Sequence, residues 1–485
     1  MTRHSKSYSS LPSISIVGMG YVGLSTAVCF AKRGFRVYGV EVDEEKRKKI
    51  SKGISPIHEP GLDALLKTTL KSGKLSCHSD YSDAVSQSDV TFVTVGTPSR
   101  DSGEIDLRFI ESAAAEIGRV LRAKGDYHIV AMKSTVVPGT TEGTVKRIVE
   151  TSSYRKIPSE IGLCVNPEFL REGTAIEDTM SPDAVVIGSS DKKTLKVMSS
   201  LYRMFYGRRL PQLIMLSTSS AEFVKYSVNT FRATQLSFLN TLANLCEKVP
   251  SADIDQVVMG LSTVTGLDRR YLRSGLGFGG SCLPKDVRAL KALCKTSGVN
   301  PSILEAALDI NERQPLKVLD LSRALLGDIT GKKIALLGLA FKAGTDDIRE
   351  SVAIKIANAL SLAGAEVRAY DPKAMPNSKR ELHPNVSLLT DVATCLAGSD
   401  LCVIATEWEE FRRISPSLVV KHMKSPVMID GKRLLDAAKF ATFGIEVIEL
   451  GRYIEEKMPS FEGKAEFSQE ILSVYQSRSG GMQVP

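Results

Sequence analysis

The sequence lacks the residue patterns that a metal centre, a disulfide framework or a membrane span requires. Its eight cysteines are widely and irregularly spaced without a C-x-x-C pair, and its six histidines do not have the spacing of metal ligands. It has no signal-peptide pattern and no run of about 18 apolar residues. We therefore expect no metal and no membrane contact, with most thiols buried in a protein of the reducing cytoplasm.

Length and composition limit the number of domains and the class of protein. With 485 residues, the chain exceeds what one hydrophobic core usually organises, and its 43% hydrophobic and 24% charged residues are ordinary for a globular protein. The formal charge of +8 comes from scattered lysines and arginines that are not interleaved with aromatic residues, so we expect no nucleic-acid partner. The charge fits small polyanionic ligands, and it fits a merely basic surface equally well.

The order of apolar runs predicts an α/β protein of two Rossmann-like, doubly wound parallel-sheet domains joined by a central helical spine. We expect an NAD-binding domain at 13–217, a helical and dimerising domain at 218–324 and a C-terminal nucleotide-sugar domain at 325–467. The ends, 1–12 and 468–485, are expected to be disordered or flexible. Strands are predicted in these runs: ISIVG, RVYGVEV, VTFVTVG, HIVAMKS, IGLCVNP, AVVIG, KKIALLGLAF, AEVRAYDP, SDLCVIAT and PVMIDGKRLLD.

A glycine motif follows the first predicted strand and opens a helix. Gly18, Gly20 and Gly23 form G-x-G-x-x-G, which permits a tight turn, close approach of a pyrophosphate and close packing of helix on strand. Glu41 ends the second predicted strand, where a carboxylate accepts hydrogen bonds from a ribose and repels a 2′-phosphate. A lone motif of this kind can be a plain turn. With strand, helix and acid together, the pattern favours NAD over NADP.

The stretch GFGGSCLPKDVRAL contains the best nucleophile candidate. Pro284 suits the first turn of a helix, so Cys282 lies at the helix entrance, where the dipole and a nearby ammonium favour a thiolate. The preceding glycines leave space for a substrate, and Asp286 lies four residues on, on the same face. Taken alone, Cys282 and Asp286 would more simply indicate a capped helix with an unreactive thiol.

Two further segments carry polar groups suited to catalysis. Lys225 and Asn229 lie four residues apart on a long predicted helix, where an ammonium and a carboxamide would stabilise an oxyanion. In isolation an ordinary surface lysine is the better explanation of Lys225. The segment NPEFLREGTAIED places Glu168 and Glu172 after a strand at the carboxyl edge of the first sheet. Either carboxylate could activate water or start a helix.

Together these motifs resemble the UDP-glucose/GDP-mannose 6-dehydrogenase family over residues 13–450. The matching stretches are GMGYVGL, VGTPS, KSTVVPGT, NPEFLREGTA, the helix with Lys225 and Asn229, GFGGSCLPKD, FKAGTDDIRES, YDP and IDGKRLLD. The resemblance implies that NAD oxidises a primary alcohol at sugar C6 to an aldehyde held on Cys282 as a thiohemiacetal. A second oxidation gives a thioester, which is hydrolysed to the acid.

The resemblance also implies the roles of individual residues. Lys225 and Asn229 would stabilise alkoxide and oxyanion, Asp286 would assist Lys225 through a water, and Glu168 would help to hydrolyse the thioester. Thr135 would hold a water. Residues implied to contact NAD, beyond the three glycines and Glu41, are Tyr21, Val22, Lys46, Thr97, Thr135, Glu172 and Arg349. Residues implied to contact the nucleotide sugar are Glu168, Phe169, Leu170, Lys225, Asn229, Phe278, Gly279, Lys342 and Arg433.

The sequence departs from the family pattern at three places. Glu41 stands where an aspartate is common, Leu283 replaces a phenylalanine of UDP-glucose members, and the segment DRRYLRSGLGFGG is short. The last two resemble GDP-mannose members. We expect UDP-glucose as substrate, with GDP-mannose as the alternative and a UDP-N-acetylaminosugar less favoured. Arg269 or Arg270 is expected to reach the substrate of a neighbouring subunit in a homodimer or larger homo-oligomer.

Two other functional classes share part of this pattern. A two-electron β-hydroxyacid dehydrogenase also has a Rossmann domain followed by helices and uses a lysine, but it needs neither a nucleophilic cysteine nor a second nucleotide-binding domain. An NAD-binding regulator without catalysis would not need Cys282, Lys225 and Asp286 together. The sequence therefore favours the covalent dehydrogenase.

Overall fold

A computed structural model describes residues 11–454, in which the chain divides into two compact units, one up to Val228 and one from Asn229 onward. Residues 1–10 of the expected N-terminal segment, and the whole expected tail at 468–485, lie outside the described residues. The expected domain boundaries after residues 217 and 324 remain predictions. Within residues 11–454, no helix is long and apolar enough to span a membrane.

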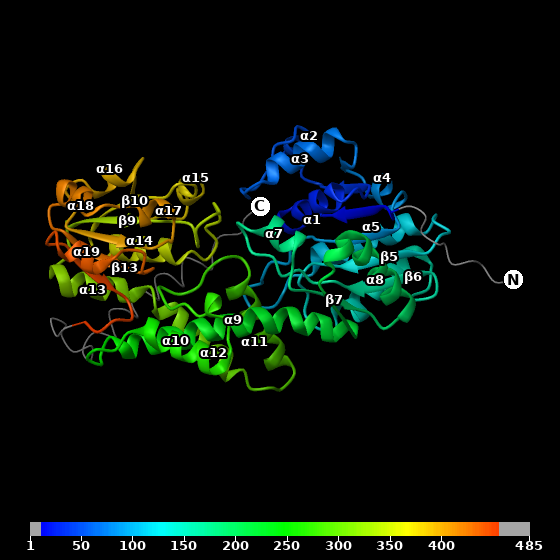
Figure 1. The fold of residues 1–485 in the computed structure, drawn as a ribbon. Coiled ribbons are helices and arrows are strands. Elements are labelled where there is room, and N and C mark those ends of the chain that lie inside the picture. The colour runs from blue at the N-terminus through cyan, green and yellow to red at the C-terminus, as the bar shows by residue number, and fades with distance from the viewer. Residues whose placement is uncertain (1–10, 455–485) are drawn as a thin grey trace. The chain divides into compact units, whose positions relative to one another are not determined.

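The first unit is built on a sheet of eight strands in the described part of the chain, in the order β3-β2-β1-β4-β5-β6-β7-β8. Figure 1 shows this unit, with β5, β6 and β7 labelled in the sheet. The strands are β1 (Ile14–Val17), β2 (Val37–Val40), β3 (Leu75–His78), β4 (Val90–Val93), β5 (His128–Met132), β6 (Ile161–Val165), β7 (Ala184–Gly188) and β8 (Gln212–Leu216). The helices are α1 (Tyr21–Lys32), α2 (Glu44–Ser51), α3 (Leu62–Lys71), α4 (Tyr81–Val85), α5 (Arg108–Leu121), α6 (Lys146–Ser153), α7 (Ala175–Met180) and α8 (Lys192–Tyr206).

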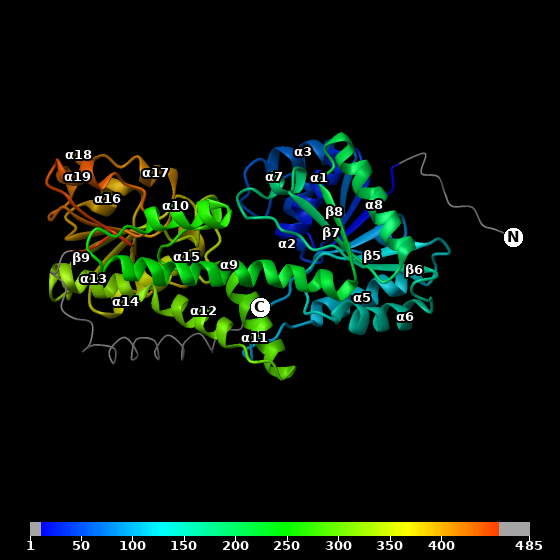
Figure 2. The same cartoon turned by 60° about the horizontal axis from the view of Figure 1, so that its bottom comes forward.

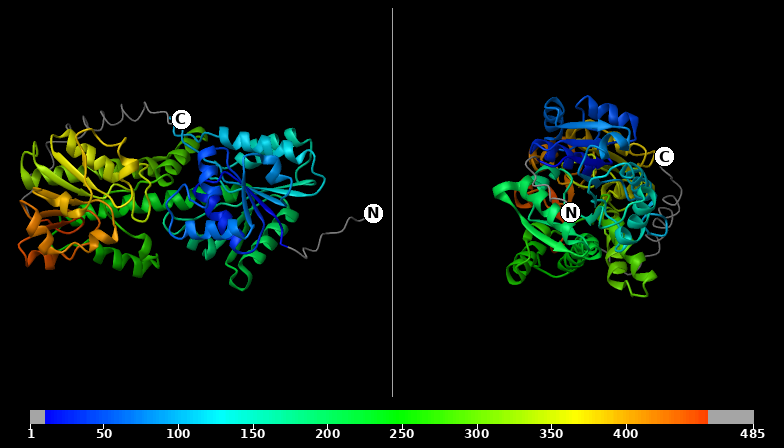
Figure 3. Two further views of the ribbon diagram at one scale, coloured as in Figure 1. Left: turned by 90° about the horizontal axis from the view of Figure 1, so that it is seen from above. Right: turned by 90° about the vertical axis from the view of Figure 1, so that its right-hand side faces the viewer.

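Both faces of the central strands are buried. Alternate residues of a strand point to opposite sides of the sheet, and helices cover each side. Phe92 packs in one hydrophobic cluster with α1, α3 and α8, whereas its neighbour Val93 packs in another with α4, α5 and α6. The central strands therefore read as continuous apolar runs, which is why the sequence revealed them. Figure 3 shows the helical layers from two further sides.

The edges of the sheet differ from the sequence prediction. Strands β3 and β8 were not predicted, since β3 reads LSCH and β8 is only half buried. The strands from β1 to β6 are parallel to their neighbours, but β7 runs antiparallel to β6 and pairs in parallel with β8. The prediction that the first sheet is purely parallel is therefore wrong at this edge.

A helical region follows, without a strand between residues 218 and 326 of the described chain. Its helices are α9 (Thr218–Cys246), α10 (Ile254–Thr265), α11 (Leu283–Thr296), α12 (Ser302–Arg313) and α13 (Leu316–Leu326). Figure 2 shows α9 as one continuous helix, which begins in the first unit and continues through the second. In the second unit, α9 packs through Leu239 against Ile254 of α10 and through Ala233 against Val287 of α11.

The second unit also contains a parallel sheet, in the order β11-β10-β9-β12-β13-β14 for the described residues. Its strands are β9 (Lys333–Leu337), β10 (Glu366–Tyr370), β11 (Ser387–Leu388), β12 (Leu401–Ile404), β13 (Val427–Asp430) and β14 (Glu446–Glu449). Its helices are α14 (Val352–Leu362), α15 (Met375–Ser378), α16 (Val392–Leu396), α17 (Glu409–Arg412), α18 (Pro416–His422) and α19 (Ala437–Ala441). The predicted fold class is confirmed, although the short or polar edge strands β11 and β14 were missed.

Candidate active site

The turn between β1 and α1 has the geometry of a pyrophosphate site. Gly18 has φ +91°, and a Cβ on it would lie 3.0 Å from the carbonyl oxygen of Thr94. A Cβ on Gly23 would lie 1.9 Å from the Gly18 oxygen, so helix and strand pack too closely for a side chain. A Cβ on Gly20, at the start of α1, would meet no protein atom within 4 Å. This open space at a helix N-terminus fits a diphosphate.

Glu41 lies beside this turn at the end of β2. Its buried carboxylate accepts hydrogen bonds from the backbone N–H groups of Met19, at 3.2 Å, and Asp43, at 3.0 Å. These bonds fix the carboxylate where a ribose would follow the pyrophosphate. Lys46 lies in the first turn of α2, is half exposed and pairs with Asp43 at 3.7 Å. The residues present fit NAD.

Glu59 is a site residue that sequence reasoning missed. Its buried carboxylate accepts hydrogen bonds from the Tyr21 hydroxyl and from the backbone N–H groups of Gly173, at 2.7 Å, and Ala175, at 2.8 Å. The loop that carries Glu172 is thereby tied to the glycine turn. The motif HEPGL gave no signal for this contact, because Glu59 and Gly173 lie 114 residues apart.

Glu168 and Lys225 form a buried ion pair in the first unit. The Lys225 ammonium donates to the Glu168 carbonyl oxygen at 2.7 Å and lies 3.0 Å from Glu168 Oε1. The other carboxylate oxygen accepts from the Leu170 N–H at 2.7 Å, and the Lys225 Nζ lies 5.3 Å from the centre of the Phe169 ring. The structure thus brings together four residues that the sequence placed in one site.

A second buried lysine lies in the same unit. Lys133 Nζ lies 3.0 Å from Asn166 Oδ1, which also accepts a hydrogen bond from the Tyr202 hydroxyl. Burial lowers the pKa of Lys133 to about 8; the charge of Glu168 opposes this shift, and that of Lys225 adds to it. Sequence reasoning passed over this residue, which precedes the Ser134–Thr135 pair of KSTVVPGT.

Cys282 is the single exposed thiol among the eight cysteines, all of which lie in the described residues. It occupies the N-cap of α11, with Pro284 in the first turn, as the sequence predicted. The Asp286 N–H donates to the Cys282 carbonyl oxygen at 2.9 Å. By contrast, burial raises the pKa of Cys29 and of Cys164 to about 12, which leaves both as protonated core residues.

Asp286 is buried one turn into α11 and is shared by two donors. Its Oδ2 accepts from the Asn229 side-chain amide of α9 at 2.6 Å, and its Oδ1 from the Lys285 ammonium at 2.5 Å. Two residues that the resemblance implies in catalysis, Asp286 and Asn229, are therefore in contact within the second unit. Lys285 was not anticipated, although it adjoins Asp286 in the same motif.

The glycine loop before Cys282 packs on the segment that contains Lys342 and Arg349. A Cβ on Gly279 would lie 2.2 Å from the Glu350 carbonyl oxygen, and the Gly280 N–H donates to the Arg349 carbonyl oxygen at 2.9 Å. Asn311 holds both backbone groups of the buried Phe278, at 2.7 and 2.9 Å. The loop is thus fixed by backbone contacts, while Lys342 is half buried and Arg349 is exposed.

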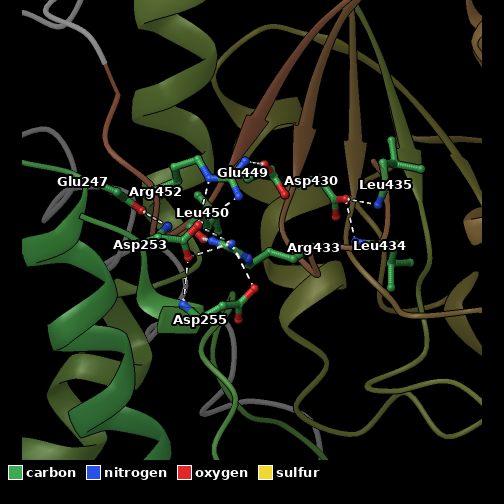
Figure 4. Close-up of polar contacts among 11 residues, drawn as sticks. Glu247, Asp253, Asp255, Asp430, Arg433, Leu434, Leu435, Glu449, Leu450 and Arg452 are labelled. Atoms are coloured by element: carbon green, nitrogen blue, oxygen red, sulfur yellow. Dashed lines mark hydrogen bonds and ion pairs between the residues drawn. The ribbon is translucent and has the colours of Figure 1, made fainter. Parts of the chain in front are cut away.

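Arg433 lies after β13 in an ionic cluster (Figure 4). Its Nη2 lies 2.9 Å from Asp253 Oδ1 and 3.0 Å from Asp255 Oδ2, and its Nη1 donates to the Leu450 carbonyl oxygen at 3.0 Å. Arg452 shares Asp253, at 2.9 Å. A phosphate at Arg433 would have to compete with these two aspartates. The sequence did not reveal Asp253 or Asp255, which lie about 180 residues away in α10 and at its N-cap.

The remaining predicted residues lie in loops. Thr97 follows β4 and Thr135 follows β5, both half buried at the carboxyl edge of the first sheet. Arg269 and Arg270 are exposed before the glycine loop, and Arg270 pairs with Asp268 at 2.6 Å. Among residues 11–454, no three His, Cys, Asp or Glu side chains are grouped to hold a metal ion.

Three family models match the chain in sequence order. They are the NAD-binding domain at residues 12–206, the central domain at 219–313 and the UDP-binding domain at 335–437 of the UDP-glucose/GDP-mannose dehydrogenase family. The chain belongs to this family. It is an NAD-dependent oxidoreductase, and the predictions of NAD as cofactor and of a nucleotide sugar as ligand are confirmed at this level.

Individual relatives agree with the family assignment. The UDP-glucose 6-dehydrogenase of Haloferax volcanii is 40% identical over 87% of this chain and 97% of its own. The structure of a UDP-glucose dehydrogenase from Pyrobaculum islandicum is 35% identical, with a TM-score of 0.84, and covers 93% of this chain and 100% of its own. The GDP-mannose dehydrogenase of Pseudomonas aeruginosa is 36% identical, with a TM-score of 0.51, over 90% and 99% of the two chains.

The family domains correspond to the groups of residues described above. The glycine turn, Glu41 and Glu59 lie in the NAD-binding domain, and Lys342 and Arg349 lie in the UDP-binding domain with Arg433. The central domain contributes Lys225, Asn229, Cys282 and Asp286.

We expect Glu59→Ala to lower the free energy of unfolding by about 2–4 kcal/mol, because it leaves buried hydrogen-bond donors without an acceptor. Thermal or denaturant unfolding measures the change. Glu44→Ala, at a side chain that is 65% exposed, is the matched control and should stay within about 0.5 kcal/mol. Equal effects of the two variants would contradict the contact described for Glu59.

Lys133 should make stability depend on pH. Its folded pKa of about 8 is below the ordinary value of 10.5, so between these values the unfolded chain holds a proton that the folded chain has lost. The free energy of unfolding therefore rises with pH in this window, by at most about 1.4 kcal/mol per pH unit. When unfolding is compared from pH 7 to pH 10.5, the free energy of unfolding of wild type should rise relative to that of Lys133→Met. Parallel curves would contradict the lowered pKa.

Proposed function

We propose that the protein oxidises UDP-glucose at C6 to UDP-glucuronate in two NAD-dependent steps, through a thiohemiacetal and a thioester on Cys282. The observation that carries the proposal is the position of this thiol, which is exposed at the N-terminus of α11, one turn before the Asp286–Asn229 contact. The similarity to the UDP-glucose 6-dehydrogenase of Haloferax volcanii and to the UDP-glucose dehydrogenase of Pyrobaculum islandicum supports this substrate.

The glycine turn and Glu41 would hold NAD, with Tyr21, Val22, Lys46, Thr97, Thr135, Glu172 and Arg349 as the further proposed contacts. When bound, NAD accepts one hydride from the sugar carbon in each oxidation. Lys342 and Arg433 would bind the nucleotide diphosphate or ribose, and Phe278, Gly279, Phe169 and Leu170 would line the sugar site. At Arg433 the phosphate would compete with Asp253 and Asp255 for the guanidinium.

In the first oxidation, C6 of the sugar loses a hydride and its hydroxyl loses a proton, which leaves an aldehyde. Lys225 and Asn229, four residues apart on α9, would stabilise the alkoxide from which the hydride departs. The Cys282 thiol loses its proton as its sulfur adds to the aldehyde carbon, and the resulting oxyanion takes up a proton to give the thiohemiacetal. The covalent bond retains the reactive aldehyde on the protein.

In the second oxidation, the thiohemiacetal carbon loses a hydride and its hydroxyl loses a proton, giving a thioester. Water then attacks the carbonyl carbon, Glu168 accepts the proton of the water, and the carbon–sulfur bond breaks to release the acid and restore the thiol. Thr135 would hold a water, and Asp286 would orient Asn229 and a proton-carrying water. Each sugar acid consumes two NAD and one water.

A second candidate substrate is GDP-mannose. Leu283 and the short segment before Cys282 favour it, and the 36% identity to the Pseudomonas aeruginosa enzyme is close to that of the UDP-glucose relatives. Both sugars present the same primary alcohol at C6, so the mechanism is unchanged. The base and the configuration at C2 distinguish the two candidates.

We also propose that the enzyme is a homodimer formed through α9. Phe231, Phe238 and Leu245 recur every seven residues along α9 and are each more than half exposed. Large apolar side chains at this spacing form a seam that a second copy of the helix can cover by two-fold symmetry. Arg269 or Arg270 would then reach the partner's substrate. Eight free thiols fit the reducing cytoplasm.

Measuring NADH formed per sugar should give two for the true substrate. We expect a higher kcat/KM for UDP-glucose than for GDP-mannose and a still lower value for a UDP-N-acetylaminosugar. Cys282→Ser should lower kcat at least about a thousandfold, whereas Cys294→Ser, later in the same helix, should remain close to wild type. One NADH per sugar with free aldehyde, or normal turnover by Cys282→Ser, would refute the covalent mechanism.

Phe238→Glu should convert the dimer to a monomer, because it places a charge in the apolar seam. Sedimentation or light scattering across a concentration series measures the change. Val420→Glu, at an exposed valine of α18, is the control and should leave the oligomer intact. An unchanged mass for Phe238→Glu would place the interface elsewhere.

A further inference from the structure

Lys133 and Asn166 occupy equivalent places at the ends of neighbouring strands. Lys133 follows β5 directly and Asn166 follows β6, and the Asn166 N–H donates to the Met132 carbonyl oxygen at 2.7 Å. The two side chains therefore meet at the carboxyl edge of the sheet, where parallel α/β proteins bind ligands. Glu168 lies two residues after Asn166 in the same loop.

Every polar group of Asn166 is used to hold this loop. Its side-chain amide donates to the Val186 carbonyl oxygen at 2.8 Å, while its Oδ1 accepts from the Lys133 ammonium at 3.0 Å and from the Tyr202 hydroxyl. Lys133 and Tyr202 thus contact the same oxygen atom, one as a charged donor and the other as a neutral donor. Both are buried.

The charges in this region do not cancel. Within the first unit, Lys133 and Lys225 bring two buried positive charges and Glu168 brings one buried negative charge. A buried ammonium is costly, and an apolar side chain of the same length would pack there without that cost. A lysine in this position is therefore better explained by its effect on a neighbouring charge than by stability.

Resting on the proposed role of Glu168 in thioester hydrolysis, we propose that Lys133 is a positioning residue that acts through Glu168. Its ammonium holds Asn166, and with it the start of the Glu168 loop, and its charge supplies a second positive neighbour to that carboxylate. The positive charge that acts on Glu168 in this unit then comes from Lys133 as well as from Lys225.

The titration of Lys133 makes this role testable. The groups that act on it are Glu168, Lys225 and Cys164, with the Tyr202 hydroxyl at the shared oxygen and the Phe92 ring 5.8 Å away. Because the pKa of Lys133 is about 8, the ammonium is present below this pH and is lost above it. The pKa of Tyr202 is raised far above this range by burial, so its hydroxyl stays neutral throughout.

The experiment compares kcat of wild type with that of Lys133→Met and of Tyr202→Phe from pH 6.5 to pH 9.5, with NAD and the sugar that wild type oxidises. The ratio of wild-type to variant rates cancels titrations common to both enzymes. For Lys133→Met we expect a ratio of about ten at pH 7 that falls several-fold as pH rises through 8. For Tyr202→Phe we expect a smaller ratio that does not change with pH.

Two further variants separate charge from packing. Lys133→Gln keeps a hydrogen-bond donor for Asn166 without the charge, and it should reproduce the pH-dependent ratio even if Lys133→Met folds poorly. In a Glu168→Gln background, Lys133→Gln should have little additional effect, since the residue that it acts through is already neutral. Thermal unfolding and NAD binding, measured for each variant, report whether the first unit is intact.

Distinct outcomes overturn the two proposals. A ratio for Lys133→Gln that is independent of pH, or a full effect in the Glu168→Gln background, would refute the inference about Lys133 in an active enzyme. A wild-type protein that formed no NADH from UDP-glucose or GDP-mannose would instead refute the proposed function, and with it the role assigned to Glu168.

Discussion

Helix α9 is joined to three functional segments by buried polar contacts, and the arrangement of the site residues depends on these contacts. Glu222 accepts from the loop that follows Thr135, Lys225 binds Glu168 and Asn229 binds Asp286. Because buried polar groups are costly without partners, each contact fixes one loop on the helix. In the first unit the helix thereby holds the Glu168 loop, and in the second unit it holds the start of α11.

Burial shifts the pKa of the cysteine thiols and the pKa of Lys133 in opposite directions. Seven cysteines are wholly or partly buried, and burial raises the pKa of Cys29, Cys164 and Cys395 to about 12, while Cys282 is exposed at a helix N-terminus. Lys133, in contrast, has a lowered pKa, because its buried position disfavours the charge. The same physical effect, desolvation, keeps the buried thiols protonated and allows Lys133 to lose its proton near pH 8.

Close backbone approach explains the glycine loop better than flexibility does. A side chain on Gly279 would collide with the Glu350 oxygen, and Gly280 bonds to the Arg349 oxygen. The loop before Cys282 is therefore fixed against the segment that contains Lys342 and Arg349. Arg433 is also held, but by the side-chain charges of Asp253 and Asp255.

The sequence by itself determined the features that depend on local pattern: the glycine turn, the buried central strands, the start of α11 at Cys282 and the family. It did not reveal β3, β8, β11 and β14, because edge strands are short or partly polar and lack a continuous apolar run. Only the tertiary structure decided the partners of Glu59, Lys133 and Arg433. Their contacts join residues from 33 to 180 positions apart, and such pairings follow from packing, which no local pattern encodes.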